Sequence, residues 1–199
     1  MFAIVKIDKY KDRNLIKDLE RHNERFNSPR QRNANINALK TYANYHLIRP
    51  TKSYMDTIQD RILIANIKRL RRDSVILQEG LITASPDFFK VSSSDEINRY
   101  FNYTLQFFIN RYGRDNFITA VVHMDEEIPH MHFDFVPITS DNRLSSKEII
   151  GGPHGLSKLQ DAFFEYMVCE YPNFEREAPS VCRSHKVDDK PYKIYNMKV

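Results

Sequence analysis

Residues 117–138 read FITAVVHMDEEIPHMHFDFVPI. Two segments rich in β-branched and aromatic residues, 117–124 and 130–138, flank a short polar stretch, which predicts two antiparallel strands joined as a hairpin. Side chains alternate along a strand, so the residues divide between two faces. One face holds only apolar residues, which are Ala120, Val122, Met131, Phe133 and Phe135. The other holds His123, His130, His132 and Asp134. The hairpin therefore predicts a sheet that packs one face against helices and presents three imidazoles on the other.

Three imidazoles on one open sheet face are typical of a divalent metal site that keeps positions free for substrate or water. If His123 lies opposite His130, all three side chains emerge together. Asp125 and Glu126 lie in the connecting turn, where either carboxylate could orient a ligand or accept a proton. The alternative is a group of surface histidines that the hairpin merely brings together.

The segments around the hairpin predict an alternation of strands and helices. We expect strands over residues 2–8 and 74–85, helices over 14–25, 53–69, 93–112 and 156–171, and an irregular segment over 30–49. The helix over 93–112 has the clearest signals, because Ser93 and Glu96 form a capping box and Gly113 follows its end. The order predicts the α+β class: a mostly antiparallel sheet, helices packed on one face and the metal site on the open face.

Length and composition are those of one globular domain, and we expect residues 1–199 to form it. No apolar run approaches the ~20 residues of a membrane helix, and Lys6 interrupts the first apolar stretch. Cys169 and Cys182 lack metal or redox spacing, which favours a reducing compartment. The expectation is a soluble cytoplasmic protein without a membrane segment.

Charge is unevenly distributed along the chain. Residues 1–75 contain 17 Lys and Arg against 8 Asp and Glu, a balance of +9, whereas residues 76–199 contain 13 against 18. A cluster at Lys68, Arg69, Arg71 and Arg72 is the kind of surface that a phosphate backbone selects. The alternative is a solvated helix end, since basic residues there also complement the helix dipole.

Four segments together resemble a known family. They are the pattern His-x-Asp-Glu-x-x-Pro-His-x-His from His123 to His132, the sequence His22-Asn23-Glu24-Arg25, the pair Asn44-Tyr45, and Leu144-Ser145-Ser146-Lys147. The combination resembles plasmid mobilisation relaxases of the Mob/Pre (MobV) type, which are HUH endonucleases. Such proteins usually continue into a long helical C-terminal region, so the resemblance implies that residues 1–199 are the catalytic part of a longer protein that dimerises through the absent region.

The resemblance implies site- and strand-specific nicking and rejoining of plasmid DNA at an origin of transfer, which initiates mobilisation. The reaction would be a metal-dependent transesterification that leaves the protein on the 5′ phosphate. His123, His130 and His132 would bind one divalent ion, with Mn favoured and Mg, Zn, Co or Ni as alternatives. His22 would be the nucleophile, with Tyr45 as the alternative, and Glu126 the catalytic carboxylate.

The implied partner is origin DNA, single-stranded or in hairpin form near the nick. The residues assigned to DNA contacts are Asn23, Arg25, Arg71, Arg72 and Lys147. Other interpretations stay open: a rolling-circle replication initiator, an origin-binding protein that does not cut, and a small-molecule metallohydrolase, which would leave the basic N-terminal third unexplained. No role is assigned to His46, His154 or His185.

Overall fold

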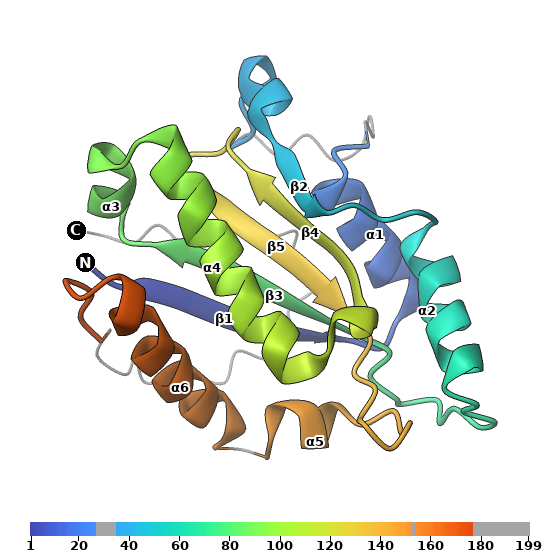
Figure 1. The fold of residues 1–199 in the computed structure, drawn as a ribbon. Coiled ribbons are helices and arrows are strands. Elements are labelled where there is room, and N and C mark those ends of the chain that lie inside the picture. Colours follow the sequence, from blue (N-terminus) through green and yellow to red (C-terminus); the bar gives the residue numbers. More distant parts are fainter. Residues whose placement is uncertain (27–34, 153, 177–199) are drawn as a thin grey trace.

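The computed structural model describes residues 1–26, 35–152 and 154–176, and its centre is a five-stranded antiparallel sheet (Figure 1). The strands are β1 (Ala3–Tyr10), β2 (Tyr45–Ile48), β3 (Leu77–Ala84), β4 (Phe117–His123) and β5 (His130–Phe135), and their spatial order is β1-β3-β5-β4-β2. The predicted hairpin is therefore the pair β4 and β5, with His123 opposite His130. This hairpin lies inside the sheet, where a neighbouring strand flanks each of its members.

The first face of the sheet is covered by α4 (Ser94–Tyr112) and α6 (Gly155–Glu170), with the short helices α3 (Pro86–Val91) and α5 (Ser146–Ile150) beside them (Figure 1). The Ser93 half of the predicted capping box forms, because Ser93 Oγ accepts from the Glu96 amide, and Gly113 ends the helix with a φ of 81°. The predicted apolar face of the hairpin belongs to the core beneath these helices. The predictions of this helix and of the apolar hairpin face are confirmed.

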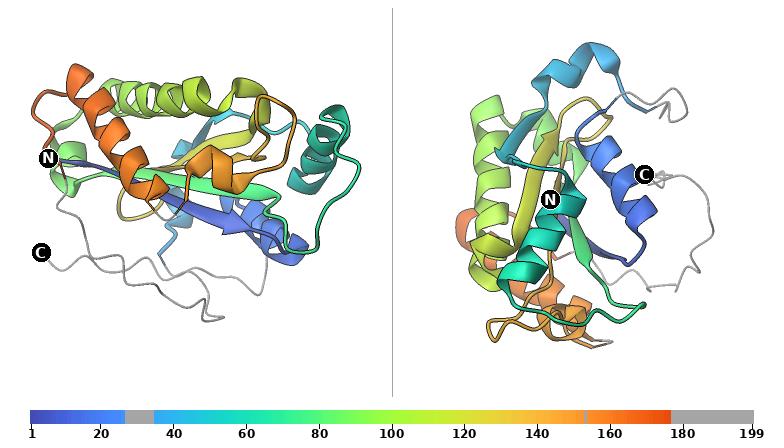
Figure 2. Two further views of the ribbon diagram at one scale, coloured as in Figure 1. Left: turned by 90° about the horizontal axis from the view of Figure 1, so that it is seen from below. Right: turned by 90° about the vertical axis from the view of Figure 1, so that its right-hand side faces the viewer.

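The second face is also covered. There α1 (Arg13–Asn23) and α2 (Tyr54–Ile64) bury Ile16, Leu19 and Ile58 in a separate cluster with Leu77 of β3. Figure 2 shows α1 and α4 on opposite sides of the sheet. The α+β class is confirmed, but the expectation of helices on one face only is corrected, since the few apolar positions of α1 suffice to bury it against the sheet. Helix α1 therefore covers the sheet face that carries the histidines.

Other boundaries also differ from the prediction. Within the segment expected to be irregular, the described part forms the 3-10 helix η1 (Ala38–Ala43) and the edge strand β2. Helix α2 ends early, because Asn66 adopts the left-handed conformation with a φ of 55°. A short 3-10 turn, η2 (Arg114–Asn116), leads from α4 into β4. Cys182 and His185 lie outside the described residues. No helix in the described ranges combines the length and apolar character that crossing a membrane requires.

Candidate functional site

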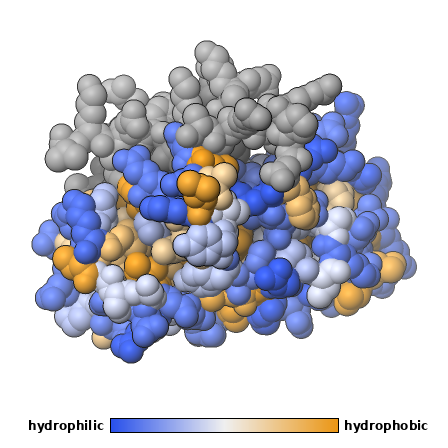
Figure 3. Space-filling model, turned by 90° about the horizontal axis from the view of Figure 1, so that it is seen from above, coloured by the Kyte–Doolittle hydropathy of each residue, from blue (hydrophilic) through white to orange (hydrophobic). Residues whose placement is uncertain are grey.

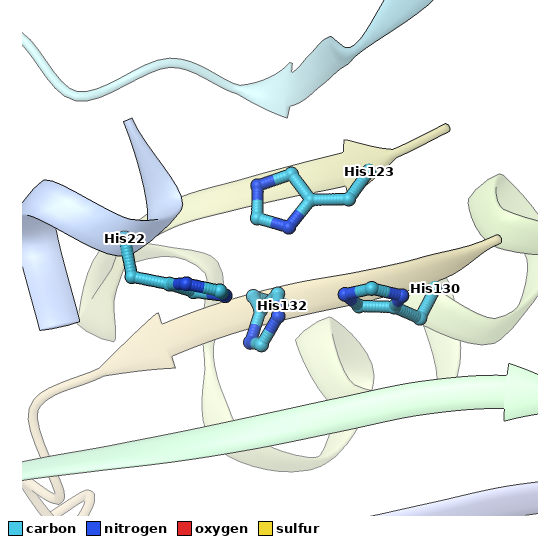
Figure 4. Close-up of side chains that lie close together, drawn as sticks. All are labelled: His22, His123, His130 and His132. Carbon is cyan, nitrogen blue, oxygen red and sulfur yellow. The ribbon is translucent and has the colours of Figure 1, made fainter. Parts of the chain in front are cut away.

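Four histidines converge between α1 and the sheet (Figure 4). His22 comes from the last turn of α1, His123 from the end of β4, and His130 and His132 from β5. One ring nitrogen from each lies within 4.8 Å of the others. The convergence of the three hairpin histidines fits the predicted metal site, and the fold places His22 beside it.

His132 is oriented by a carboxylate on the neighbouring strand. Its Nδ1 lies 2.6 Å from Oε1 of Glu79 in β3, and the hydroxyl of Tyr10 donates to Oε2 of the same carboxylate at 2.7 Å. Nε2 of His132 is buried and has no hydrogen-bond partner among the described residues. A carboxylate that holds one nitrogen while the other faces a shared centre is the usual arrangement of metal-binding histidines.

The other two hairpin histidines repeat this arrangement with backbone acceptors. Nε2 of His123 lies 3.0 Å from the carbonyl oxygen of Asn23, and Nδ1 of His130 lies 2.8 Å from that of Ile128. Nδ1 of His123 is buried without a hydrogen-bond partner in the part of the chain that the structure describes. Unpartnered buried nitrogens are costly unless something binds them, so this donor set fits a divalent cation.

Arg25 connects the end of α1 to the hairpin turn. Its guanidinium donates to both carboxylate oxygens of Asp125, at 2.7 and 3.0 Å, and to Oε1 of Glu126 at 2.7 Å. That same Glu126 oxygen lies 4.0 Å from Nε2 of His22 and 4.0 Å from Nδ1 of His123. Arg25 thereby fixes a buried carboxylate beside the histidines, and the charge-assisted contacts make this arrangement stiff.

Burial lowers the pKa of three histidines of the cluster. It lowers the pKa of His22 to about 3, with further lowering from the charges of His132 and Arg25. Burial likewise holds the pKa of His123 and of His132 well below the usual range, and neighbouring histidines add to the effect. Near neutral pH these imidazoles are uncharged, which is the form that binds a metal or attacks an electrophile.

The residues expected to contact DNA do not lie on one surface. Asn23 is 1% exposed and donates to Asp134 at 2.8 Å, while Arg25 is occupied by the turn carboxylates, so both side chains face the interior. The side chain of Asn23 is thus not open to a DNA strand in this arrangement, and its assignment to a DNA contact stays a prediction. Arg71 and Arg72 lie exposed after α2, and Lys147 lies exposed on α5, away from the histidines.

Tyr45 lies on the opposite side of the sheet from the histidines. It pairs with Val122, so its side chain points toward the core under α4, and its hydroxyl is buried there. Burial raises the pKa of Tyr45 to about 12. The next residue, His46, faces the site side instead and contacts Glu24 at 2.9 Å, which ties the end of α1 to the sheet edge.

Two further supporting residues were not predicted from the sequence. Glu79 is the single acid within the apolar strand β3, and an isolated acid in a buried strand is a signal that could have identified it. Thr41 donates to Asp125 at 2.9 Å from a segment with no periodic pattern, and no sequence signal indicates this contact.

Comparison with known proteins agrees with the geometry. The sequence model of the Mob_Pre family, described as plasmid recombination enzyme, matches residues 1–192. A plasmid recombination enzyme type 1 of Staphylococcus aureus is 39% identical over 168 residues, covering 83% of this chain and 41% of the relative. One of Bacillus thuringiensis is 38% identical over 161 residues, covering 80% and 36%. The chain thus spans about two fifths of the length of these relatives.

Solved structures show the same fold. A Mn-bound crystal structure of the MobM relaxase domain with 22 nucleotides of plasmid pMV158 oriT DNA superimposes with a TM-score of 0.81 at 27% identity, covering 94% of this chain and 96% of that one. A second, with a 3′-thiophosphate on the DNA, gives 0.80 at 28% identity, covering 94% and 95%. The match along nearly the whole sequence, together with the shared fold, shows that the chain belongs to the Mob_Pre family of plasmid recombination enzymes.

Proposed function

We propose that this chain nicks and rejoins one strand of plasmid DNA at an origin of transfer, through a covalent link to the 5′ phosphate. The observation that carries the proposal is the placement of His22 beside three histidines, each of which offers a ring nitrogen to one shared centre, and two of which, His123 and His132, have a buried nitrogen without a hydrogen-bond partner among the described residues. Family membership and the DNA-bound, Mn-bound structures with the same fold support it. A small-molecule metallohydrolase would not account for the basic balance of residues 1–75.

His123, His130 and His132 would hold one divalent ion, for which Mn is the favoured candidate because the similar relaxase structures are Mn-bound. When bound, such an ion withdraws charge from a phosphate oxygen and offsets the negative charge of the transition state. Glu79, Asn23 and Ile128 fix the three imidazoles in the required orientation, so the protein needs little reorganisation when the ion arrives.

His22 would supply the nucleophile. Its side chain is 24% exposed, whereas those of the other three histidines are 7% exposed or less, so a DNA strand reaches His22 first. Attack by Nε2 forms a phosphorus–nitrogen bond and breaks the bond from phosphorus to the 3′ oxygen, which leaves the 5′ phosphate on the imidazole. Nε2 must be unprotonated when it attacks, and overall one imidazole proton passes to the 3′ oxygen, which leaves as a hydroxyl. Glu126, 4.0 Å from Nε2, is placed to accept that proton from the imidazole and to pass it on. Reversal by a 3′ hydroxyl rejoins the strand.

The test is incubation of the purified chain with supercoiled plasmids that carry candidate origins, with Mn present. We expect relaxed circles with protein attached to a 5′ end, and we expect His22→Ala to bind Mn but give no relaxed circles. His154→Ala, an exposed histidine at the start of α6, is the matched control and should nick normally. Nicking by His22→Ala at the wild-type rate would overturn the role of His22, and no nicking of any cognate origin by the wild type would overturn the function.

A further inference from the structure

The helix η1 carries two large side chains that contact almost nothing. Leu39 is 85% exposed and Tyr42 is 89% exposed, and the basic residue Lys40 between them is exposed as well. In Figure 1, η1 projects from the sheet edge at the end where β4 and β5 meet. Figure 3 views the molecule from that end and shows apolar side chains interrupting an otherwise hydrophilic surface. Such exposure of apolar area on a fixed element is typical of an interaction surface.

The base of η1 is held firmly to the hairpin turn. The Asn37 amide donates to the carbonyl of Asp125 at 2.7 Å, and Thr41 donates to the Asp125 carboxylate at 2.9 Å. On the other side of η1, the amide of Met124 donates to Oδ1 of Asn44 at 2.7 Å. The exposed side chains of η1 therefore project from a rigid support, so a ligand that binds them does not have to order the segment first.

This support leads directly to the histidine site. Asp125 accepts a hydrogen bond from Thr41 and two more from Arg25. Arg25 also donates to Glu126 and holds its Oε1 4.0 Å from His22. Hydrogen bonds through Asp125 and Arg25 thus connect η1 to Glu126, which lies beside the proposed nucleophile. A strand bound at the histidines would have its neighbouring nucleotides close to η1.

We propose that Tyr42 forms a stacking platform for a nucleobase of the single DNA strand that enters the site, with Leu39 packing against the same base and Lys40 near the backbone. The inference rests on the proposed function. It adds which part of the DNA substrate η1 binds, namely a base of the single strand. Bases of single strands are held by stacking on aromatic side chains combined with positive charge, and that is the combination on η1. The excess of basic residues in this third of the chain favours a nucleic acid over a basic or purely apolar protein partner.

The test separates base contacts from phosphate contacts. Fluorescence anisotropy would measure binding of a labelled strand of mixed sequence and of a fully abasic strand of the same length. We expect Tyr42→Ala to bind the base-bearing strand about tenfold more weakly, within the range for loss of one stacked base, and the abasic strand as tightly as the wild type does. Tyr42→Phe should keep the affinity, because stacking needs the ring and not the hydroxyl.

The control is Leu63→Ala, which removes a side chain of α2 that is 78% exposed and distant in the fold from η1, and which should change neither affinity. Equal binding by Tyr42→Ala and wild type would overturn the inference, and so would an equal loss on both strands. So would a smaller sedimenting mass for Tyr42→Ala in the absence of DNA, which would make η1 an interface between copies.

The stacking platform and the proposed function can fail separately. Nicking by the wild type together with any of these contrary results would overturn the platform and leave the proposed function standing. A base-dependent effect of Tyr42→Ala, combined with no nicking of any origin by the wild type, would support the platform and overturn the proposed function.

Discussion

His132 and Glu79 lie on adjacent strands, and Nδ1 of the histidine is 2.6 Å from Oε1 of the carboxylate. Glu79 is 2% exposed and is also held by Tyr10. A negative charge at this point makes the opposite nitrogen of His132 a stronger electron donor and fixes the plane of its ring.

Removing that charge should therefore weaken metal binding without removing a ligand. We expect Glu79→Gln, which keeps the volume and an acceptor oxygen, to lower Mn affinity by about 10- to 100-fold. Isothermal titration calorimetry measures this directly. The matched control is Glu127→Gln in the exposed part of the hairpin turn, which should bind Mn as the wild type does. Equal affinities for wild type and Glu79→Gln would mean that Glu79 only fills space.

Metal should also stabilise the fold, because it binds the folded site and not the separated strands. At a free Mn concentration of about 100 times Kd the gain is about 2.7 kcal/mol, which corresponds to a rise in Tm of roughly 5–10 °C. A thermal melt with Mn and with chelator shows the difference, and His132→Ala should abolish it. His154→Ala should retain the full rise. A rise that persists in His132→Ala would place the ion elsewhere.

The bond to DNA should be a phosphoramidate. Phosphorus–nitrogen links to histidine break in acid, whereas a phosphotyrosine ester survives it. We expect an acid-labile adduct that disappears in His22→Ala and remains in Tyr45→Phe, since the Tyr45 hydroxyl lies under α4 on the other side of the sheet. An acid-stable adduct that is lost in Tyr45→Phe would require the sheet to open and would refute the assignment of His22.

The basic loop after α2 should contribute to DNA affinity through phosphates alone. The double change Arg71→Ala, Arg72→Ala should weaken binding to many sequences alike and flatten the dependence of log affinity on log salt by up to about two units, one for each contacted phosphate. Arg143→Ala is a suitable control, because Arg143 is exposed but already paired with Asp141 and Glu148. An unchanged slope in the double variant would mean that DNA does not contact this loop.

Strand β3 contains a position that accepts no side chain. A Cβ on Gly80 would lie 2.0 Å from the ring of Phe133, which packs over the glycine in the core under α4. We expect Gly80→Ala to lower the free energy of unfolding by about 1–3 kcal/mol, since the buried ring must shift. Chemical denaturation measures the loss. Gly152→Ala, where a Cβ meets nothing within 4 Å, should be close to neutral, and equal stability of both variants would show that Phe133 repacks freely.

The parts of the fold that the sequence predicts are those with local signals. Helix α4 is marked at both ends by Ser93 and Gly113, and the second strand of the hairpin alternates between polar and apolar residues, so His123, His130 and His132 could be placed together from their spacing. Strand β2 has only four residues and exists because it pairs with β4, which is a partner that no local pattern reveals.

The residues of the site also divide into those that a local sequence signal indicates and those that only the tertiary structure brings together. The neighbours of His22 in sequence indicated a functional segment, but the pairing of Arg25 with Asp125 depends on how α1 crosses the sheet. A basic residue beside a candidate nucleophile suggests a phosphate contact, and only the tertiary structure shows that its donors face two buried carboxylates. Asn23 is similar, since its burial against Asp134 follows from the packing of α1 and not from its own polarity.

The strand order also has a consequence for synthesis on the ribosome. His22, the proposed nucleophile, and both edge strands are made first, and the strands that fill the middle of the sheet are made last. Strand β2 has no partner until β4 emerges, and the proposed ligands arrive only with the hairpin. Long-range pairing of this kind is slow to form. A nascent or cleaved chain that ends before residue 130 would hold His22 but lack a complete cluster, so the capacity to cut DNA would appear only when nearly the whole sheet has assembled.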